Sequence, residues 1–600
     1  MTSQHLGLTT ELEPLLLDYL PLDQNDEGFM AGSRVRKFTD DGTYLRMIDS
    51  SSTGVVESLS LTLEGVENLV TPFGPALIEK YFRNIHPTSP ILLEDSFRQA
   101  YQAKRGLSPA LLAAVYFVAL RWLEPGSGIQ TLRRPDALRL ESVACRLLNE
   151  SLARPNMSTL QAGLLLSQKS ALFTPALIAQ LVTVGFDLSL HQDCSNWKIP
   201  AWERGLRKRL AWALYAQDKW CALTHGRPSQ IFAPNWTVPE LTLKDFEGAY
   251  SCPKGSGNSE SVPANGSSGP LLFCRFVALT FILSDILDTF YTLHAAHDFA
   301  AAGEYSTRII LERAKPIQIR LKNWFAGLPP EVKMDSMAGE EGAANGGLHL
   351  AYFATEITLH RCIIRSITPS TADPYLTHIC RSAAKTRLIS AMDFVNRLRP
   401  QHLRSFWPSA SRTNFGLIGA FGILLRLTAE TREEETFYQT RLGEYRWTLS
   451  VSCKDAEFLA AVIDSLDVAS SLLRNAPGKP VLGEYMARSA STTPPQQAQM
   501  HGAHGGRPGG VVRFRDEQER IEDKDAETGM DSDGRNPPLQ TTNGARREPV
   551  RRDTAGSSSS TIPAGLASPA TSIVSSMGTV SGTGAGPSTI NSSVSEQHRK

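Results

Sequence analysis

The stretch IILERAKPIQIRLKNWFAGLPP, residues 309–330, shows the pattern that decides the fold. Its apolar residues recur at intervals of three or four positions, at Ile310, Ala314, Ile317, Leu321 and Trp324. This spacing places them on one face of an α-helix. Gly327 and the pair Pro329-Pro330 follow, and these residue types end helices. Pro316 lies within the pattern, so we expect a kink or a break there.

The same spacing recurs through residues 72–475, which predicts an all-α body. Further helices are predicted at Ala76–Ile85, Pro109–Leu123, Ala137–Leu152, Thr159–Gln168, Pro175–Leu188, Ala201–Leu223, Leu271–Ala295, Leu348–Ile367, Tyr375–Leu398, Asn414–Thr431 and Ala456–Leu473. Two polar interruptions, at 251–270 and 335–347, are expected to be surface loops within this body. We therefore interpret 72–475 as one large helical domain.

The two flanks of this body differ from it in composition. In residues 1–71, the stretch RVRKFTDDGTYLRMIDS (34–50) has a turn at Gly42 between β-prone pieces, so we expect a partly ordered appendage with a hairpin. Residues 476–600 are rich in Gly, Ser, Thr and Pro and nearly lack aromatic residues after Pro480. Such a segment buries too little apolar surface to offset its ordering entropy, and we expect a long disordered tail.

Composition excludes several classes of protein. The chain of 600 residues has 61 Lys+Arg and 61 Asp+Glu, so its formal net charge is zero, which argues against holding nucleic acid by bulk electrostatics. Its eight cysteines are scattered and form no CxxC pair, which is typical of reduced intracellular thiols. The N-terminus lacks the basic segment of a signal peptide. The most apolar stretch, 271–293, contains Arg275, Asp285 and Asp288, so we expect no membrane span.

A search for catalytic motifs finds no GxxxxGKS/T, GxSxG or HExxH sequence. Glu356 and His360 share a helix face, but Cys362 lies on another, and we favour a structural role for them over a metal site. Asp285 and Asp288 have the spacing of a magnesium site in an all-α enzyme, but no second ligand motif accompanies them. We therefore predict no enzyme, no catalytic residue, and no metal or cofactor held by this chain.

The segment from Leu181 to Pro239 is the most informative one. Pro200 is expected to start a helix whose centre places Trp212 in the core. We expect its basic run to be paired within the protein, with a carboxylate one or two turns on, rather than to contact DNA; the run consists of Arg204, Arg207, Lys208 and Arg209. After the helix, Arg227 is expected to fix the loop by bidentate hydrogen bonds.

This segment resembles the fungal-specific transcription factor domain, the middle homology region of fungal binuclear zinc-cluster regulators. The resemblance rests on an ordered set of residues, namely His86-Pro87, Arg209, Trp212, Asp218 and Gly226-Arg227-Pro228. Looser matches occur at Tyr81-Phe82, Pro90-Ile91-Leu92, Trp324 with Leu328-Pro329, and Leu359-His360-Arg361. The N-terminal runs 5–21 and 34–47 are similar to TamA-type co-activators of nitrogen-catabolic genes.

The resemblance implies a nuclear transcriptional regulator or co-activator of nitrogen-utilisation genes, with the matched residues in structural or regulatory roles. It implies other zinc-cluster transcription factors as partners, indirect contact with DNA, and contact of the tail with the transcription machinery. The sequence departs from the family in one respect, because no cysteine precedes Cys145 and the six-cysteine zinc cluster is absent.

Two explanations of this departure remain open. Either Met1 is an internal methionine of a longer product that carries the zinc, or the chain acts through partners that bind DNA. The other functions that the sequence leaves open are a cytoplasmic helical scaffold and, least favoured, a metal-dependent enzyme that uses Asp285 and Asp288.

Overall fold

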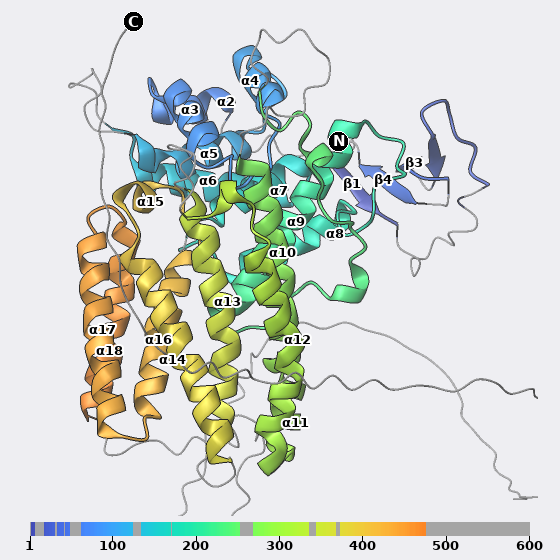
Figure 1. Ribbon diagram of the computed structural model, residues 1–600. Coiled ribbons are helices and arrows are strands. Elements are labelled where there is room, and N and C mark those ends of the chain that lie inside the picture. Colours follow the sequence, from blue (N-terminus) through green and yellow to red (C-terminus); the bar gives the residue numbers. More distant parts are fainter. Residues whose placement is uncertain are drawn as a thin grey trace, which may run out of the picture. The chain divides into compact units, whose positions relative to one another are not determined.

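The computed structural model describes residues 2–6, 17, 19–30, 33–40, 43–48, 62–123, 134–169, 171–251, 268–334, 344–367 and 373–475. Helices dominate this part of the chain, and its strands all lie before residue 50 (Figure 1). The all-α prediction is confirmed for the main body. The predicted tail at 476–600 and most of the two predicted loops, 252–267 and 335–343, lie outside the described residues.

A four-stranded antiparallel sheet forms near the N-terminus, in the order β1-β4-β3-β2. Its strands are β1 (Thr2–His5), β2 (Glu27–Met30), β3 (Ser33–Lys37) and β4 (Tyr44–Ile48). In the β3–β4 pair, Arg36 lies opposite Leu45. This pair confirms the two predicted strands of the hairpin, and the predicted turn at Gly42 lies outside the described residues. β1 and β2 were not predicted.

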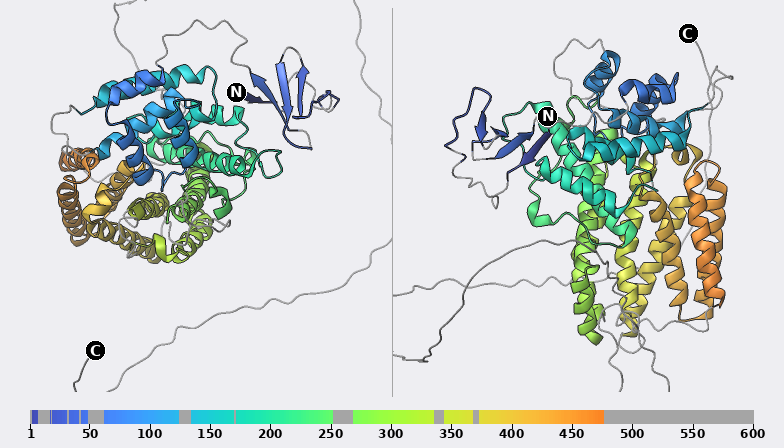
Figure 2. Two further views of the ribbon diagram at one scale, coloured as in Figure 1. Left: turned by 90° about the horizontal axis from the view of Figure 1, so that it is seen from above. Right: turned by 180° about the vertical axis from the view of Figure 1, so that it is seen from behind.

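The sheet lies beside the helical body, where β1 contacts α8 (Figure 2). Its side chains pack against the loop before helix α9. Phe38 and Leu45 form a small buried cluster with Trp197, and the rings of Phe38 and Trp197 are 5.2 Å apart. The Lys198 N–H donates a hydrogen bond to the Phe38 carbonyl at 2.9 Å. The N-terminal appendage is thus joined to the helical body within the segment 181–239 that the sequence singled out.

In the first half of the helical body, α5 is apolar and buried on nearly every face, and it contacts α2, α3, α6 and α7. The helices of this half are α2 (Leu63–Val70), α3 (Gly74–Asn84), α4 (Glu94–Ala103), α5 (Pro109–Ala119), α6 (Ala137–Leu152), α7 (Met157–Leu166), α8 (Pro175–Asp187) and α9 (Ala201–His225), with the short helices η1 (Leu120–Trp122), η2 (Ala233–Asn235) and η3 (Leu243–Phe246). Local sequence explains several starts: Thr174, for example, accepts the Leu177 N–H at the beginning of α8.

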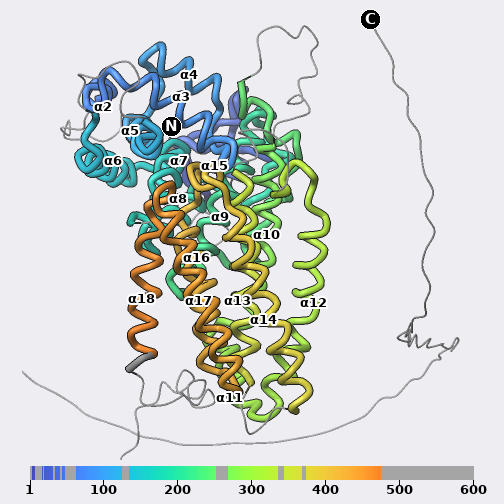
Figure 3. The backbone as a smooth tube through the Cα atoms, turned by 60° about the vertical axis from the view of Figure 1, so that its left-hand side comes forward, coloured from blue at the N-terminus to red at the C-terminus, as the bar shows by residue number. Residues whose placement is uncertain are grey.

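The second half is built of long helices that run alongside one another around α13 (Figure 3). Its helices are α10 (Ser268–Phe290), α11 (Leu293–Ala301), α12 (Ser306–Ala326), α13 (Asn345–Ser366), α14 (Pro374–Asn396), α15 (Pro400–Arg404), α16 (Ser411–Leu427), α17 (Arg432–Ser452) and α18 (Ala460–Asn475), with η4 (Gly303–Tyr305), η5 (Pro330–Val332) and η7 (Glu457–Leu459). α13 contacts α10, α12, α14 and α16. One cluster of buried apolar side chains extends from Val66 to Leu466, so the two halves share a core.

Helix α10 is long and apolar enough to span a membrane, judged by length and composition alone. In the structure it packs against α9, α12 and α13, and 56% of its most apolar 18-residue window is buried inside the protein. A helix at the centre of a large core has the same composition as a membrane span.

Several predicted boundaries need correction. α12 continues through Pro316 without a break, because this residue is exposed and water can reach the carbonyl that its ring leaves unbonded. α10 begins at Ser268 and α13 at Asn345, so the last residues of both predicted loops are helical. The buried Val66 places α2, which the sequence analysis assigned to the appendage, in the main core.

The sequence analysis also missed α2, α4, α11, α15 and α17. α17 is the clearest case, because this helix of 21 residues buries only Tyr438, Tyr445 and Leu449. Because so few apolar residues of α17 are buried, their helical spacing is hard to recognise among the polar residues between them.

Candidate functional site

Helix α9 carries most of the residues that the sequence singled out, and it contacts α7, α8, α10 and η3. It starts after Pro200, as predicted, and ends at Gly226, whose left-handed backbone (φ 60°) suits glycine. Unlike an amphipathic surface helix, α9 is buried on nearly all sides from Gly205 to Ala222. Its polar residues therefore need partners inside the protein.

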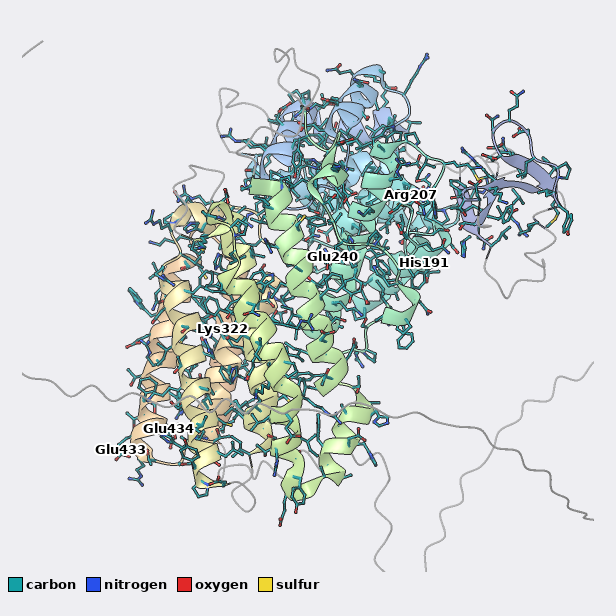
Figure 4. The ribbon with its side chains drawn as sticks, turned by 45° about the vertical axis from the view of Figure 1, so that its right-hand side comes forward. His191, Arg207, Glu240, Lys322, Glu433 and Glu434 are labelled. Carbon is teal, nitrogen blue, oxygen red and sulfur yellow. The ribbon has the colours of Figure 1, made fainter. Side chains whose placement is uncertain are left out.

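Two basic residues of α9 are buried and paired. Arg207 Nε donates to Glu203 Oε1 at 3.0 Å, and a second nitrogen of Arg207 donates to the Leu188 carbonyl at 3.0 Å. Lys208 Nζ donates to Asp245 Oδ2 at 2.8 Å and to the Glu240 carbonyl at 3.2 Å. Figure 4 shows Arg207 and Glu240 in the same region of the protein. These cations are occupied within the fold.

Arg209 is fully buried at the junction of α9 with the loops around it. Its Nε donates to the Pro90 carbonyl at 2.7 Å, and another guanidinium nitrogen donates to the Asp245 carbonyl. Burial lowers the pKa of Arg209 to about 10, so it stays charged at neutral pH. Gly205 allows this approach, because a Cβ there would lie 2.6 Å from the Asp245 carbonyl oxygen.

The internal pairing of the basic run is therefore confirmed, but the expected partner was wrong. Arg204 also points inward and donates to the carbonyls of Trp197 and Ile199. The carboxylates that pair with the run are Glu203, one turn earlier, and Asp245 in η3. Asp218, the carboxylate further along the helix, has other partners.

Trp212 is 1% exposed at the centre of α9, which confirms its predicted place in the core. Its indole N–H donates to the Pro239 carbonyl at 3.0 Å. The ring contacts Phe281 of α10 edge to face, with centroids 4.8 Å apart, and Trp236 at 5.7 Å. Trp212 thus joins α9, α10 and the loop after η2.

Asp218 holds the chain segment that follows the end of α9. Its two carboxylate oxygens accept the Gln230 N–H at 2.8 Å, the Ile231 N–H at 3.0 Å and the Ser229 hydroxyl at 2.6 Å. Nζ of the neighbouring Lys219 lies 3.6 Å from Oδ2 of Asp218 and donates to the Ile231 carbonyl at 2.7 Å. We call Asp218, Lys219 and Ser229 the α9 clamp.

The predicted role of Arg227 was wrong. Its side chain is exposed, and no hydrogen bond or ion pair joins it to the described residues. The α9 clamp fixes the loop instead, because the backbone N–H groups beyond Pro228 face the Asp218 carboxylate. Gly226-Arg227-Pro228 therefore forms an exposed turn held from within.

His86 and Pro87 lie where the first helices meet α10. The fully buried His86 donates through Nε2 to the Ala249 carbonyl at 2.8 Å, and Phe82 and Tyr250 lie around its ring. Burial, with a smaller contribution from Arg209 and Arg98, lowers the pKa of His86 to about 3. Its neighbour Pro87 touches the start of α10, since a Cβ at Gly269 would lie 2.8 Å from the Pro87 carbonyl oxygen.

A pocket opens where α9, α10, α13 and the start of α16 meet, and we call it the α9–α16 pocket. Its volume is about 60 Å³. Its walls are mainly apolar and include Leu164, Trp220, Phe273, Phe276, Leu348 and Phe406. Thr88 and Ser89, directly after His86-Pro87, also line it, as does Gln217 next to Asp218. None of the family-motif residues lines the pocket, although Pro87 and Asp218 directly adjoin residues that do.

Two side-chain amide oxygens at the α9–α16 pocket lack hydrogen-bond partners among the described residues. Oδ1 of Asn414 and Oε1 of Gln168 are buried and accept no hydrogen bond from any described residue. Asn414 is only 3% exposed, and it lies in the first turn of α16. A buried amide oxygen without a partner costs free energy, so such groups in a pocket mark a place where a ligand or water can bind.

The residues weighed as metal ligands have other partners in the structure. Glu356 is paired with Arg387 at 3.2 Å and accepts the Tyr352 hydroxyl, while burial raises the pKa of Glu356 and lowers that of His360 to about 4. Asp285 is paired with Arg320. In the described part of the chain, His, Cys, Asp and Glu side chains form no group of three that could hold a metal ion.

Sequence reasoning missed Asp245, Lys219, Ser229 and Asn414, which complete these arrangements. The sequence contained one indication of a role for Asp245, because Thr242 and Asp245 have the spacing of a capping box at the start of a helix. The structure shows this capping box at η3. The others lie in helices or loops whose local sequence gives no indication of their partners.

Residues 78–325 match the family model of the fungal specific transcription factor domain. This match includes α9 with its basic run and the α9 clamp. No solved structure matches the chain significantly.

Over longer stretches, the chain is similar to known regulators of transcription. It is 35% identical to the transcriptional activator protein DAL81 of Saccharomyces cerevisiae over 67% of this chain and 44% of that protein. It is 24% identical to the acetamidase regulatory protein of Aspergillus oryzae over 62% of this chain and 46% of that one. It is 23% identical to the transcriptional activator protein acu-15 of Neurospora crassa over 62% of this chain and 41% of that protein. The chain spans less than half the length of each of these relatives.

Proposed function

Because residues 78–325 form a fungal specific transcription factor domain, we propose that the chain is a nuclear transcriptional regulator or co-activator that reaches promoters through a DNA-binding partner. The observation that carries this proposal is the match to the domain together with the similarity to DAL81 over two thirds of the chain. The relatives named above are regulators of transcription, which points to a protein that is not an enzyme.

The placement of basic residues supports indirect contact with DNA. Arg207, Lys208 and Arg209 are each less than a tenth exposed and are bonded to carboxylates or carbonyls of the same chain. Phosphate binding requires exposed Lys and Arg side chains, and the net charge of this chain is zero. Affinity for promoters would then come from a partner, and other zinc-cluster transcription factors are the proposed class.

Nitrogen-utilisation genes are the proposed targets. The Aspergillus oryzae relative is named for the regulation of an acetamidase, an enzyme whose substrate contains nitrogen. Under this proposal the helical body binds the partner, and residues 476–600 contact the transcription machinery. Zinc enters only if a cluster precedes Met1 in a longer product.

The proposal is tested by comparing DNA binding of the purified chain with promoter occupancy in cells. We expect purified 1–600 to bind duplex DNA weakly and equally well whatever its sequence, with affinity that falls steeply as salt rises. In cells, chromatin immunoprecipitation is expected to find the chain at nitrogen-utilisation promoters and to lose it when the partner is deleted.

Two results would contradict the proposal. Tight, sequence-selective binding by purified 1–600 at physiological salt would assign DNA recognition to this chain. Exclusion of the tagged protein from the nucleus would favour the cytoplasmic scaffold instead.

A further inference from the structure

We propose that the α9–α16 pocket binds a small, uncharged molecule whose polar end carries an N–H donor beside a hydrogen-bond acceptor, a primary carboxamide being the simplest case. This inference goes beyond the proposed function and does not depend on it. It rests on the walls of the pocket, on the unpartnered amides and on the two helices that begin there.

The walls favour an uncharged ligand with an apolar body. No Asp, Glu, Lys, Arg or His occurs among the described residues that line the pocket, so a charged ligand would lose its hydration without gaining an ion-pair partner. Phe273, Phe276 and Trp220 supply apolar surface, and Ala213, Ala216 and Ala351 keep the space open. One water needs roughly 10–15 Å³, so a volume of about 60 Å³ admits a fragment of a few heavy atoms.

The unpartnered amides call for a donor on the ligand. Oδ1 of Asn414 is buried at the pocket and accepts no hydrogen bond from the described residues, and the same holds for Oε1 of Gln168. An N–H group of a ligand would satisfy either oxygen. Gln168 already uses its Nε2 to donate to the Leu164 carbonyl at 3.4 Å, so its oxygen is the atom left available.

Two helix starts at the pocket call for an acceptor on the ligand. α13 and α16 begin after Ala344 and Ala410, and neither of these N-cap residues provides a side-chain acceptor for the first turn. Both alanines line the pocket. The first N–H group of α16, that of Ser411, already donates to the Pro408 carbonyl at 2.8 Å. The N–H groups that follow it in the first turn have no partner within the helix, and a carbonyl oxygen of the ligand would accept from them. A carboxamide carries this oxygen directly beside its N–H₂ group.

The test uses three probes of nearly equal shape on the full chain 1–600. Propionamide has the donor and the acceptor, butan-2-one replaces the N–H₂ group by a methyl group, and propionate replaces it by a charged oxygen. Saturation-transfer NMR with titration measures the affinity for each probe. We expect propionamide to bind with a dissociation constant of about 1 mM or tighter, as suits so small a ligand, and the other two to bind at least tenfold more weakly.

The variant Asn414→Leu keeps the volume of the side chain but removes the amide. We expect it to lose the preference for propionamide while its melting temperature stays equal or rises, because an unpaired buried oxygen has been removed. Asn323→Leu, the same change at an exposed position of α12, is the matched control and is expected to retain both affinity and preference.

Three outcomes would overturn the inference. Equal binding of all three probes would show apolar partitioning only, and no binding of propionamide would show a pocket that holds only water. Retention of the preference by Asn414→Leu would place the amide site elsewhere. None of these results bears on promoter occupancy, and a failed promoter assay would leave the binding result intact, so the two proposals fail separately.

Discussion

The carboxylate of Asp218 in α9 accepts the hydroxyl of Ser229 at 2.6 Å, across the turn that Gly226 makes at the end of the helix. The same carboxylate accepts two backbone N–H groups further along. A single buried side chain thus fixes the direction in which the chain leaves α9. The loop that follows contains Pro239, whose carbonyl accepts the Trp212 indole N–H.

Replacing Asp218 by Asn is expected to destabilise the fold by about 2–3 kcal/mol. The amide retains one acceptor but turns a donor toward the backbone N–H groups and leaves the buried Lys219 without its charge partner. Urea denaturation followed by circular dichroism measures the loss. Asp193→Asn in an exposed loop is the matched control and should cost less than about 1 kcal/mol. Equal losses in both variants would show that the α9 clamp adds nothing to stability.

Trp212→Ala is expected to cost about 3–5 kcal/mol, because it leaves a large cavity between α9 and α10 and an unpaired carbonyl at Pro239. Trp447→Ala is the matched control, since Trp447 on α17 is 68% exposed and its loss should change the free energy of unfolding by under about 0.5 kcal/mol. Thermal and urea denaturation of both variants make the comparison. An unchanged stability of Trp212→Ala would contradict the packing described above.

Arg209→Lys and Arg227→Lys are expected to differ sharply. Lysine cannot replace the guanidinium that reaches both the Pro90 and the Asp245 carbonyls, so Arg209→Lys should cost about 2–4 kcal/mol. Arg227 is exposed and its variant should unfold like the wild type. If Arg227→Lys proves the more costly change, the loop is held by Arg227 and not by the α9 clamp.

The unfolding free energy is expected to fall as the pH drops below about 6.5. His86 is neutral and buried in the folded state, where its pKa is about 3, whereas the unfolded chain takes up the proton near the ordinary value of 6.5. The stability that His86 contributes is therefore complete above pH 6.5 and is lost as the pH falls toward 3. His360 and His191, with pKa values of about 4, act in the same direction.

Urea titrations between pH 7.5 and pH 5.5 test this dependence. A single histidine accounts for up to about 1.4 kcal/mol per pH unit below its unfolded pKa. His86→Asn should flatten the slope, whereas Leu77→Val, a loss of core packing without a titrating group, should lower stability and keep the wild-type slope. A slope unchanged in His86→Asn would mean that this histidine is not the source.

Much of the helical body could be predicted from local pattern. The period of α12 is set by its own residues from Ile310 to Trp324, and the start of α9 by Pro200, because both features depend on neighbours a few positions away. The same logic failed at α17, where three buried residues in 21 give no clear period. At Pro316 it left a kink and a break open, and the structure excludes the break.

The sequence by itself determined the helix content, the pairing of β3 with β4, the burial of Trp212 and the internal use of the basic run, because periodicity, turn residues and charge neutrality are local or summed properties. Only the tertiary structure decided which partners those groups have. Asp245 reaches Lys208 from 37 positions away, and the start of α16 brings Asn414 to α9 across nearly 200 residues. Such pairings depend on how the helices pack against one another, and the spacing of residues along the chain does not predict that packing.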